Sequence, residues 1–374
     1  MQYPTTTKTT SSPIRMAAIS FLFNSSISAS LVFLPLYAED LGATRLQIGY
    51  IAAVYGITYF VSSFLFGRQS DIHGRLIFVR LGLLLAVAAY FLQTLVPDAV
   101  TLLLVRGTIG FCLGIASAAM MSYVYDTGIL VGSFASFGSL GWLFGTIFAG
   151  ILGDFESLFI VSAVVTGLAF MVSTTLKEER HIPQQVPLFP LGIILRNRKI
   201  YLPFLLRHMG ATAIWAIFPL FLVEEDICTD LHLIAILYGL NTGIQFIAMR
   251  MVQRFNQTLL FTTGLILSAI VFAFYGIVTE YWQIIPIQII LAVSWSCLFI
   301  GGLQILLSSN KERGTAVGLL YSTNYLAAAL GPFLGGAVSE IWGFRVLMFV
   351  ALGMSLSGLF FSPGKTIDSK TAMK

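Results

Sequence analysis

The sequence predicts an all-α integral membrane protein with twelve transmembrane helices in two six-helix bundles. Its composition, the spacing of its charges and a repeat between its two halves each point to this fold. Hydrophobic residues make up 57% of the 374 residues and charged residues only 10%, whereas soluble domains contain about 25% charged residues. Because so few charges cannot cover the surface of a soluble chain of this size, the composition indicates a membrane protein.

The charged residues divide the chain into apolar runs long enough to cross a bilayer, which requires about 20 residues of helix. The first run, over 16–38, has no charge and no clear cleavage site, so we expect it to remain as a span rather than to be removed as a signal peptide. The expected spans are 16–38, 46–66, 78–97, 99–122, 132–153, 157–176, 202–223, 232–252, 258–279, 283–307, 315–338 and 344–362.

The spans form two groups of six on either side of a polar loop. The second half of this loop, 190–199, places leucine and isoleucine beside three basic residues, which fits either a short interfacial helix or a solvated linker. We expect five parts: a cytoplasmic tail over 1–15, an N-terminal six-helix bundle over 16–176, a cytoplasmic central loop over 177–200, a C-terminal six-helix bundle over 201–362 and a cytoplasmic tail over 363–374.

Lysine and arginine lie almost entirely on one side of the predicted membrane. Twelve spans place both termini on the same side, and 17 lysines and arginines fall in the loops and tails of that side. Only Arg45 and Arg345 fall in the opposite loops, which carry most of the acidic residues, including the cluster Glu224–Asp226. We expect this cluster to have no basic or nucleophilic partner nearby. Because basic loops stay in the cytoplasm, the bias predicts cytoplasmic termini and a location in the cell membrane.

The two halves repeat each other at a nearly constant offset. Phe33–Tyr37 recurs as Ile217–Phe221, with a proline at the centre of each segment, and Gly141–Gly145 recurs as Gly331–Gly335. These matches join the first span with the seventh and the fifth with the eleventh. An offset of six spans preserves orientation, so the halves are expected to be related by a pseudo-two-fold axis along the membrane normal.

A polar stretch of ten residues, Gly67–Leu76, joins the second and third spans and reads GRQSDIHGRL. It resembles the loop motif of the major facilitator superfamily, Gly-x-x-x-Asp-x-x-Gly-Arg, at Gly67, Asp71, Gly74 and Arg75. The resemblance implies a secondary active transporter that works by alternating access, in which two bundles rock about a site near the middle of the membrane.

Two further stretches resemble the same family. Leu102–Gly110 in the fourth span is similar to the pattern Leu-x-x-x-Arg-x-x-Gln-Gly, with Ile109 in place of the glutamine. The glycines of the fifth span resemble an exporter motif in which Trp142 replaces a proline. The resemblance covers residues 15–362 and leaves the direction of transport open.

The resemblance also implies a cytoplasmic gate that holds the inner ends of the spans together in the outward-facing state. Asp71 would then face the start of the eleventh span, where unpaired N–H groups favour a carboxylate. Arg75 would pair with Asp126 at the end of the fourth span. The alternative is that these charges only set the topology. The expected gate residues are Gly67, Asp71, Gly74, Arg75 and Asp126.

Three ionisable residues lie in the interiors of the predicted spans: Arg106, Arg207 and His208. A charge within the hydrocarbon costs about 2.5–3.5 kcal/mol on insertion scales, so such residues normally face a cavity or a partner. Arg106 is expected to bind a substrate anion or to take part in proton coupling, unless it pairs with a carbonyl. Arg207 can snorkel to the inner surface, and His208 either titrates near neutral pH or packs through hydrogen bonds. No acidic residue lies at mid-membrane, which leaves the coupling ion unassigned.

Polar and aromatic side chains at helical spacing mark the expected walls of a cavity between the halves. Each of them alone is equally compatible with hydrogen bonding between helices. The full set of expected substrate or coupling residues is Arg106, Asn24, Tyr55, Tyr59, Arg207, His208, Trp215, Asn241, Gln245, Trp295, Tyr321, Asn324 and Tyr325.

The sequence therefore predicts a secondary active transporter for a small organic solute or drug, coupled to protons or another ion. Its substrate is either anionic, given Arg106, or a hydrophobic drug, given the aromatic residues. We expect a monomer without a cofactor or a metal, because the cysteines and histidines have no metal-ligand spacing. The net charge of +4 follows the membrane topology, so no nucleic-acid partner is expected. A transport-inactive sensor on the same fold is one alternative, and a membrane-embedded enzyme is a less favoured one because the sequence offers no catalytic set of residues.

Overall fold

The computed structural model describes the whole chain except residues 1–10, 130, 179–189, 311–312 and 364–374, and the described part folds into helices without a strand. This confirms the all-α prediction. The N-terminal half contains α1 (Ser11–Leu31), α2 (Leu34–Asp40), α3 (Arg45–His73), α4 (Arg75–Gln93), α5 (Ala99–Asp126), α6 (Val131–Leu152) and α7 (Phe155–Thr174). After the short helix α8 (Leu191–Arg196), the C-terminal half contains α9 (Arg198–Trp215), α10 (Phe218–Glu224), α11 (Leu231–Val252), α12 (Gln257–Tyr275), α13 (Tyr281–Ser309), α14 (Arg313–Trp342) and α15 (Phe344–Phe361).

Twelve spans can be assigned to these helices. Ten stretches of the described chain are long and apolar enough to cross a membrane, and in the first of them α1 continues into α2. The bent pair α9 and α10, with an angle of 48°, forms an eleventh. The twelfth is α14, which is 30 residues long but carries a polar segment, Tyr321–Tyr325, near its middle. The order of the spans agrees with the prediction, and the number agrees when α14 is counted as a span.

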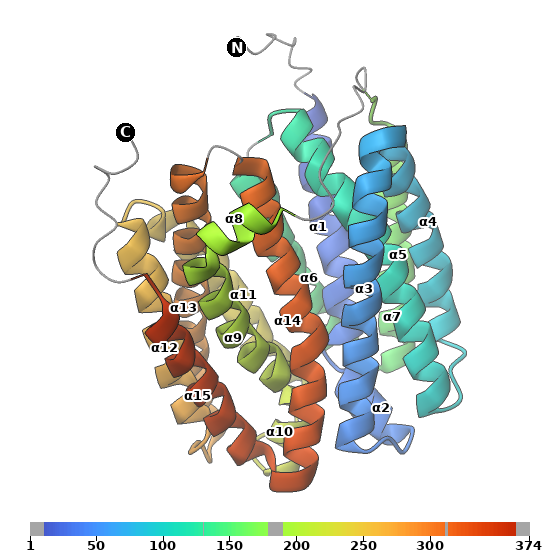
Figure 1. Cartoon of the computed structure of the whole chain (residues 1–374). Coiled ribbons are helices and arrows are strands. Elements are labelled where there is room, and N and C mark those ends of the chain that lie inside the picture. The colour runs from blue at the N-terminus through green and yellow to red at the C-terminus, as the bar shows by residue number, and fades with distance from the viewer. Residues whose placement is uncertain (1–10, 130, 179–189, 311–312, 364–374) are drawn as a thin grey trace.

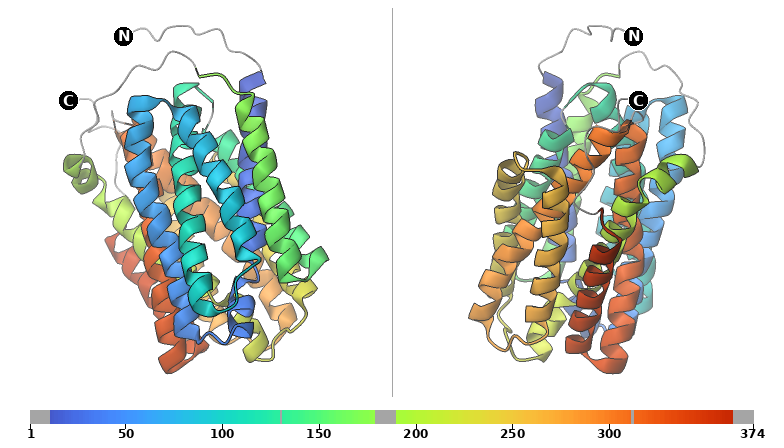
Figure 2. Two further views of the ribbon diagram at one scale, coloured as in Figure 1. Left: turned by 90° about the vertical axis from the view of Figure 1, so that its right-hand side faces the viewer. Right: turned by 60° about the vertical axis from the view of Figure 1, so that its left-hand side comes forward.

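The two halves lie side by side, α1–α7 in blue to green and α9–α15 in yellow-green to red (Figure 1). Helix α1 begins and α15 ends at the same end of the molecule (Figure 2). We call this the inner end, following the predicted orientation, and the opposite end the outer end. Helix α3 packs beside α14, and α6 packs beside α11. These two helix pairs are the junctions between the halves.

The predicted repeat is visible as a helix break in the first and seventh spans. Pro35 lies in the first turn of α2 and Pro219 in the first turn of α10. Proline has no N–H donor and is therefore tolerated in a first turn, where the N–H groups have no intrahelical partner. The same residue type thus starts the outer part of both spans.

The glycine repeat produces the same packing in both halves. A Cβ atom at Gly145 of α6 would lie 2.3 Å from the Ser25 carbonyl of α1, and one at Gly335 of α14 would lie 2.3 Å from the Ala213 carbonyl of α9. Small residues allow such close contact between membrane helices. The fifth and eleventh spans therefore pack against the first and seventh in equivalent ways.

Candidate functional site

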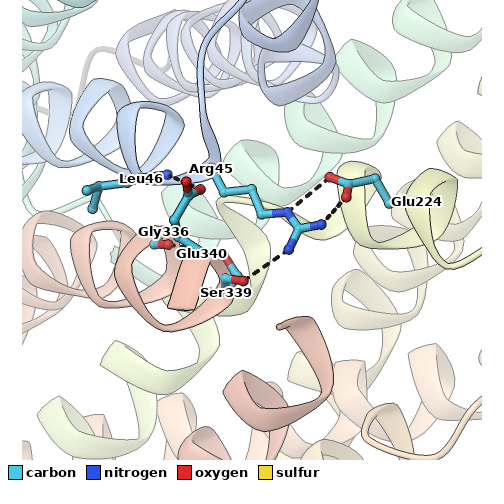
Figure 3. A network of polar contacts seen from close by, with 6 residues as sticks. All are labelled: Arg45, Leu46, Glu224, Gly336, Ser339 and Glu340. Atoms are coloured by element: carbon cyan, nitrogen blue, oxygen red, sulfur yellow. Dashed lines mark hydrogen bonds and ion pairs between the residues drawn. The ribbon is translucent and has the colours of Figure 1, made fainter. Parts of the chain in front are cut away.

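Arg45, the first residue of α3, connects the two halves at the outer end (Figure 3). Its Nε and Nη2 atoms donate to the Glu224 carboxylate of α10, with an Nε–Oε1 distance of 3.2 Å. Its Nη1 atom donates to the Ser339 carbonyl of α14 at 3.0 Å. The guanidinium carbon lies 4.2 Å from the centre of the Phe344 ring of α15. One side chain of the N-terminal half thus contacts three helices of the C-terminal half.

Two more acidic residues of the outer end have partners. Glu340 accepts a hydrogen bond from the Leu46 N–H at 3.3 Å, at a helix N-terminus that favours a carboxylate. Glu225 accepts one from Arg345 Nε at 2.9 Å. The expectation that the outer acidic cluster has no basic partner is therefore wrong. Its two arginine partners lie 179 and 120 residues away in the sequence, so only folding brings them together.

Below this network, the junction between α3 and α14 consists largely of aromatic contacts. The Tyr50 and Phe333 rings stack with their centres 5.6 Å apart. The Tyr59 and Tyr325 ring centres are 4.7 Å apart, and the Tyr325 hydroxyl lies 3.0 Å from Ser117 Oγ of α5. Tyr59 is 14 residues from either end of α3. The contacts named for this junction therefore run from the outer end to mid-depth.

The second junction, between α6 and α11, is also closed in its outer part. The His232 ring nitrogen Nδ1 lies within hydrogen-bonding distance of the Gly150 carbonyl, near the outer end of both helices. Farther from that end, Leu143 of α6 lies beside Gly239 of α11. As at the first junction, these contacts lie between the outer end and the middle of the helices.

Arg106 of α5 is buried in the N-terminal half, with 1% of its surface exposed. Its Nη1 atom donates to Ser30 Oγ at 3.4 Å, and its guanidinium carbon lies 4.5 Å from the centre of the Tyr55 ring. Tyr90 of α4 is a second hydroxyl group that interacts with this charge. The Tyr55 ring centre is 6.0 Å from that of Tyr59. A line of aromatic rings therefore connects Arg106 with the junction between α3 and α14.

Arg207 of α9 is equally buried, with 2% of its surface exposed, so the expectation that it snorkels to the inner surface is wrong. Helix α9 begins at Arg198, before the predicted start of the seventh span. Arg207 therefore lies about 14 Å along the helix from that end. Its Nε atom donates to Ser268 Oγ of α12 at 2.6 Å, and its Nη2 atom has no hydrogen-bond partner.

Two aromatic rings flank the Arg207 guanidinium but do not replace a counterion. Its central carbon lies 5.6 Å from the centre of the Phe272 ring and 5.5 Å from that of Trp295. Cation–π contacts of desolvated groups contribute about 2 kcal/mol, whereas burying an ion costs several kcal/mol. Among the described residues, no carboxylate pairs with Arg207 or with Arg106. Each half therefore holds one buried cation without an acidic partner.

A row of aromatic rings extends from Arg207 across α9, α13 and α14. The His208 ring stacks on Trp295 with centres 4.8 Å apart, and Trp295 stacks on Phe299 with centres 5.4 Å apart. Tyr321 meets the Phe299 ring edge to face at 5.8 Å. The Nδ1 atom of His208 and the Oδ1 atom of Asn324 are buried without a hydrogen-bond partner. The structure thus brings four of the predicted site residues, His208, Trp295, Tyr321 and Arg207, into one group.

Four other predicted residues have partners within the packed protein. Asn24 Oδ1 accepts a hydrogen bond from an indole of α6 at 3.1 Å, and Asn241 Nδ2 donates to a carbonyl of α13 at 3.1 Å. Gln245 Nε2 donates to Asn241 Oδ1 at 2.6 Å. The Trp215 ring packs on a tyrosine of α11, with centres 4.7 Å apart. The contacts of Asn24, Asn241 and Trp215 connect helices, whereas the Gln245–Asn241 bond lies within α11. A role of these four residues in transport stays a prediction.

At the inner end, Gly74 separates α3 from α4 with a φ of 103°, a backbone conformation that glycine adopts readily. The Glu178 carboxylate accepts hydrogen bonds from the Arg75 and Leu76 N–H groups at the start of α4. It thereby satisfies N–H groups that have no intrahelical partner. The sequence analysis did not single out Glu178, because it lies more than a hundred residues away in the central loop.

The predicted latch between Asp71, Arg75 and Asp126 stays a prediction. The surroundings of Gly67 and the side chains of Asp71 and Asp126 lie outside the described residues. Arg75 itself is buried, and its Nη1 atom donates to Ser70 Oγ at 3.0 Å.

Sequence reasoning also missed the neutral partners of the two buried arginines, notably Tyr90 near Arg106 and Tyr275 near Arg207. A signal for them exists. These two tyrosines are 185 positions apart, almost the 184 positions that separate the repeated prolines. Because they occupy equivalent places in the two halves, the two tyrosines could have been recognised as candidate neighbours of the buried arginines.

Comparison with known proteins matches most of the chain. A family model described as Major Facilitator Superfamily matches residues 16–225 and, a second time, residues 200–371. Two relatives, each named multidrug resistance protein MdtG, come from Salmonella dublin and Citrobacter koseri and are 23% and 24% identical to the chain over 373 residues. These alignments cover 91% of this chain and 92% and 91% of the respective relatives.

Solved structures show the same architecture. A mutant form of the nucleoside transporter NupG has a TM-score of 0.79 at 15% identity and covers 93% of this chain and 98% of its own. The human organic anion transporter MFSD10 has a TM-score of 0.72 at 16% identity and covers 96% of this chain and 100% of its own. At such low identity this likeness concerns the fold alone. The sequence match over both halves goes further: the chain belongs to the major facilitator superfamily and is a multi-pass membrane transporter.

Proposed function

We propose that this transporter moves a small organic solute or drug across the inner membrane by alternating access, driven by protons or another ion. The names of its relatives support such a cargo, because they are multidrug resistance proteins and its structural neighbours carry nucleosides or organic anions. The excess of lysine and arginine at the inner end supports cytoplasmic termini. The protein acts as a monomer.

The observation that carries this proposal is the position of the contacts between the halves. Every contact named above for the two junctions lies between the outer end and mid-depth, from the Arg45–Glu224 ion pair to Tyr59 and Tyr325. Such contacts are those expected of an inward-facing state. In the alternate state they separate, and the loop with Asp71 and Arg75 closes the inner end.

The roles of the two buried arginines follow from this cycle. Arg106 and Arg207 hold fixed positive charge within the bundles, and no acidic residue of the described chain neutralises either of them. A polar or anionic cargo therefore gains favourable interactions inside the protein that the hydrocarbon around it does not offer. Aromatic rings next to both arginines accommodate the apolar part of such a cargo.

A cross-link across the outer junction tests the alternating movement. Tyr50→Cys and Phe333→Cys are combined in a chain whose three native cysteines are replaced by serine, and a short bifunctional thiol reagent joins them. We expect the cross-linked protein to stop uridine efflux from vesicles and reduction of the linker to restore it. Each single cysteine variant, treated with the same reagent, is the control.

Two outcomes would contradict the proposal in different ways. Efflux at the uncross-linked rate from fully cross-linked protein would exclude a movement that opens this junction. Absence of transport for any organic solute, with ligand-dependent changes in protein fluorescence, would favour a transport-inactive sensor.

A further inference from the structure

The strongest unexplained feature of the molecule is the unpaired guanidinium of Arg207. It is 2% exposed, and one of its nitrogens, Nη2, is buried without a hydrogen-bond partner. Its only hydrogen bond among the described residues joins Nε to the neutral Ser268 hydroxyl. The two rings beside it offset only part of the cost of burying an unpaired ion. Among the described residues, the Arg207 guanidinium therefore lacks a negatively charged partner.

The shape of the surroundings indicates what kind of anion fits. His208, Trp295 and Phe299 form a stack whose successive planes are inclined by only 25° and 23°. The side chains of His208 and Trp295 are each half-buried, so part of each remains accessible. Planar aromatic groups stack favourably on such surfaces. An aromatic ligand therefore matches the stack better than a small inorganic ion does.

The depth of the stack also suits a transported ligand. Trp295 lies 14 residues from either end of α13, at the level where the named contacts between the halves end. The guanidinium carbon of Arg207 lies 5.5 Å from the centre of the Trp295 ring. A ligand that contacts Trp295 therefore lies near the guanidinium as well.

We propose that Arg207, His208 and Trp295 form a binding site for an aromatic organic anion, such as a carboxylate or a phosphonate. The anionic group accepts a hydrogen bond from Arg207 Nη2, a charge-assisted contact that is stronger than a neutral one. The ring of the ligand packs on His208 and Trp295. His208 Nδ1, which has no partner, supplies a second hydrogen bond. This inference rests on the proposed transport function and specifies the class of its cargo.

Ligand charge is tested first, on the purified full-length protein in detergent. Isothermal titration calorimetry compares 1-naphthoate with two ligands that carry the same ring, the uncharged 1-naphthalenemethanol and the cation 1-naphthylmethylammonium. We expect naphthoate to bind at least about 10-fold more tightly than either, because only it supplies the missing charge. Equal or tighter binding of the alcohol or the amine would overturn the proposal.

Variants then locate the bound anion. Arg207→Met should weaken naphthoate binding by about 10- to 100-fold, the range expected for losing a hydrogen bond to a charged group. The matched control is Arg250→Met, because Arg250 also rests on an aromatic ring, 4.2 Å from its centre, but is exposed. The control should bind like the wild type. Unchanged affinity of a folded Arg207→Met protein, or an equal loss in both variants, would overturn the proposal.

A second variant decides the question if Arg207→Met does not fold. Trp295→Phe keeps both the guanidinium and an aromatic ring. Naphthoate should quench tryptophan fluorescence in the wild type and should quench it much less in Trp295→Phe. Equal quenching in both proteins would place the ligand elsewhere and overturn the proposal. Failure here is distinct from failure of the transport function, because the outer cross-link reports alternation with uridine, which is uncharged, and needs no aromatic anion.

Discussion

The two junctions between the halves occupy equivalent places in the repeat, yet they are built differently. The junction of α3 with α14 brings backbones into contact: a Cβ atom at Gly49 would lie 2.7 Å from the Pro332 carbonyl and 2.9 Å from Gly336 Cα. The junction of α6 with α11 is close at its outer end, where a Cβ atom at Gly150 would lie 2.8 Å from Ala235 Cβ. Farther from that end it has more room, because a Cβ atom at Gly239 would lie 3.5 Å from Leu143 Cδ1, an ordinary contact.

This difference indicates which junction controls the closed state. Backbone atoms cannot yield, so α3 and α14 fit together in one geometry, and Arg45 holds them there at the outer end. A leucine side chain can change its rotamer, so α6 and α11 tolerate small changes of position. We therefore expect the closed state to depend on α3 and α14 far more than on α6 and α11.

The sharpest test of the comparison is the same substitution at both junctions. Gly49→Ala places a methyl group against backbone and should cost about 1–3 kcal/mol in the closed state, as overpacking does. Gly239→Ala meets only a flexible leucine and should be neutral or slightly stabilising, because alanine favours helix over glycine by about 1 kcal/mol. The yield of the Tyr50–Phe333 cysteine cross-link measures the closed state, and we expect about a 10-fold loss for Gly49→Ala.

Gly353→Ala on α15 is the control for a general effect on folding, because nothing lies within 4 Å of its added Cβ atom. It should leave the cross-link yield unchanged and the thermal midpoint unchanged or slightly raised, because alanine favours a helix over glycine. A lower yield in Gly239→Ala than in Gly49→Ala would reverse the comparison between the junctions.

Changing the charges of the outer end should have the next largest effect on the cross-link yield. Arg45→Glu replaces an ion pair with two facing carboxylates, the introduced one and that of Glu224, and should open the junction between α3 and α14. Because the wild-type side chains are 30% and 27% exposed, solvent screens the pair and its own contribution is about 1 kcal/mol or less. The backbone and ring contacts of Arg45 are lost as well. We expect a cross-link yield about 5-fold lower. At low salt the two carboxylates repel each other more strongly, so the yield should be lower still.

Charge reversal separates the ion pair from the other contacts. Arg45→Glu combined with Glu224→Arg restores the attraction but not the hydrogen bond to the Ser339 carbonyl, so the yield should recover only in part. Full recovery would show that the ion pair alone closes this junction. No recovery at low ionic strength would show that the pair contributes nothing.

The difference between local chemistry and long-range contacts explains how much of the fold could be predicted from the sequence. Apolar run length, the side of the lysines and arginines, and the repeated prolines depend on local chemistry, so they predicted the spans and the pseudo-two-fold repeat. The Arg45–Glu224 pair depends on contact between residues 179 positions apart, which no local pattern records. The outer acids therefore looked unpaired.

The candidate site was predictable to a similar degree. Arg207 stood out because ionisable residues are rare in a span, and Trp295 stood out because its side chain is large and aromatic. The structure places the two side chains together. The expectation that Arg207 snorkels was wrong because α9 begins at Arg198, earlier than the predicted start of the span, so Arg207 lies deeper in the protein. Asn241 and Gln245 fit a cavity wall equally well in the sequence, yet they bond to each other. Hydrophobic period alone does not distinguish a ligand contact from a contact between helices.

The smallest expected effect lies at the inner limit of the first junction. Tyr325→Phe removes the hydroxyl that lies 3.0 Å from Ser117 Oγ and 3.5 Å from the Tyr59 hydroxyl, while the ring contact with Tyr59 stays. One hydrogen bond contributes about 1 kcal/mol, so the cross-link yield should fall by less than about 5-fold. Tyr321→Phe is the control, because its ring packs within its own half. Equal effects of the two variants would mean that the hydroxyl of Tyr325 does not join the halves. The rings of Tyr59 and Tyr325 would then join the halves at this depth without help from the hydroxyl.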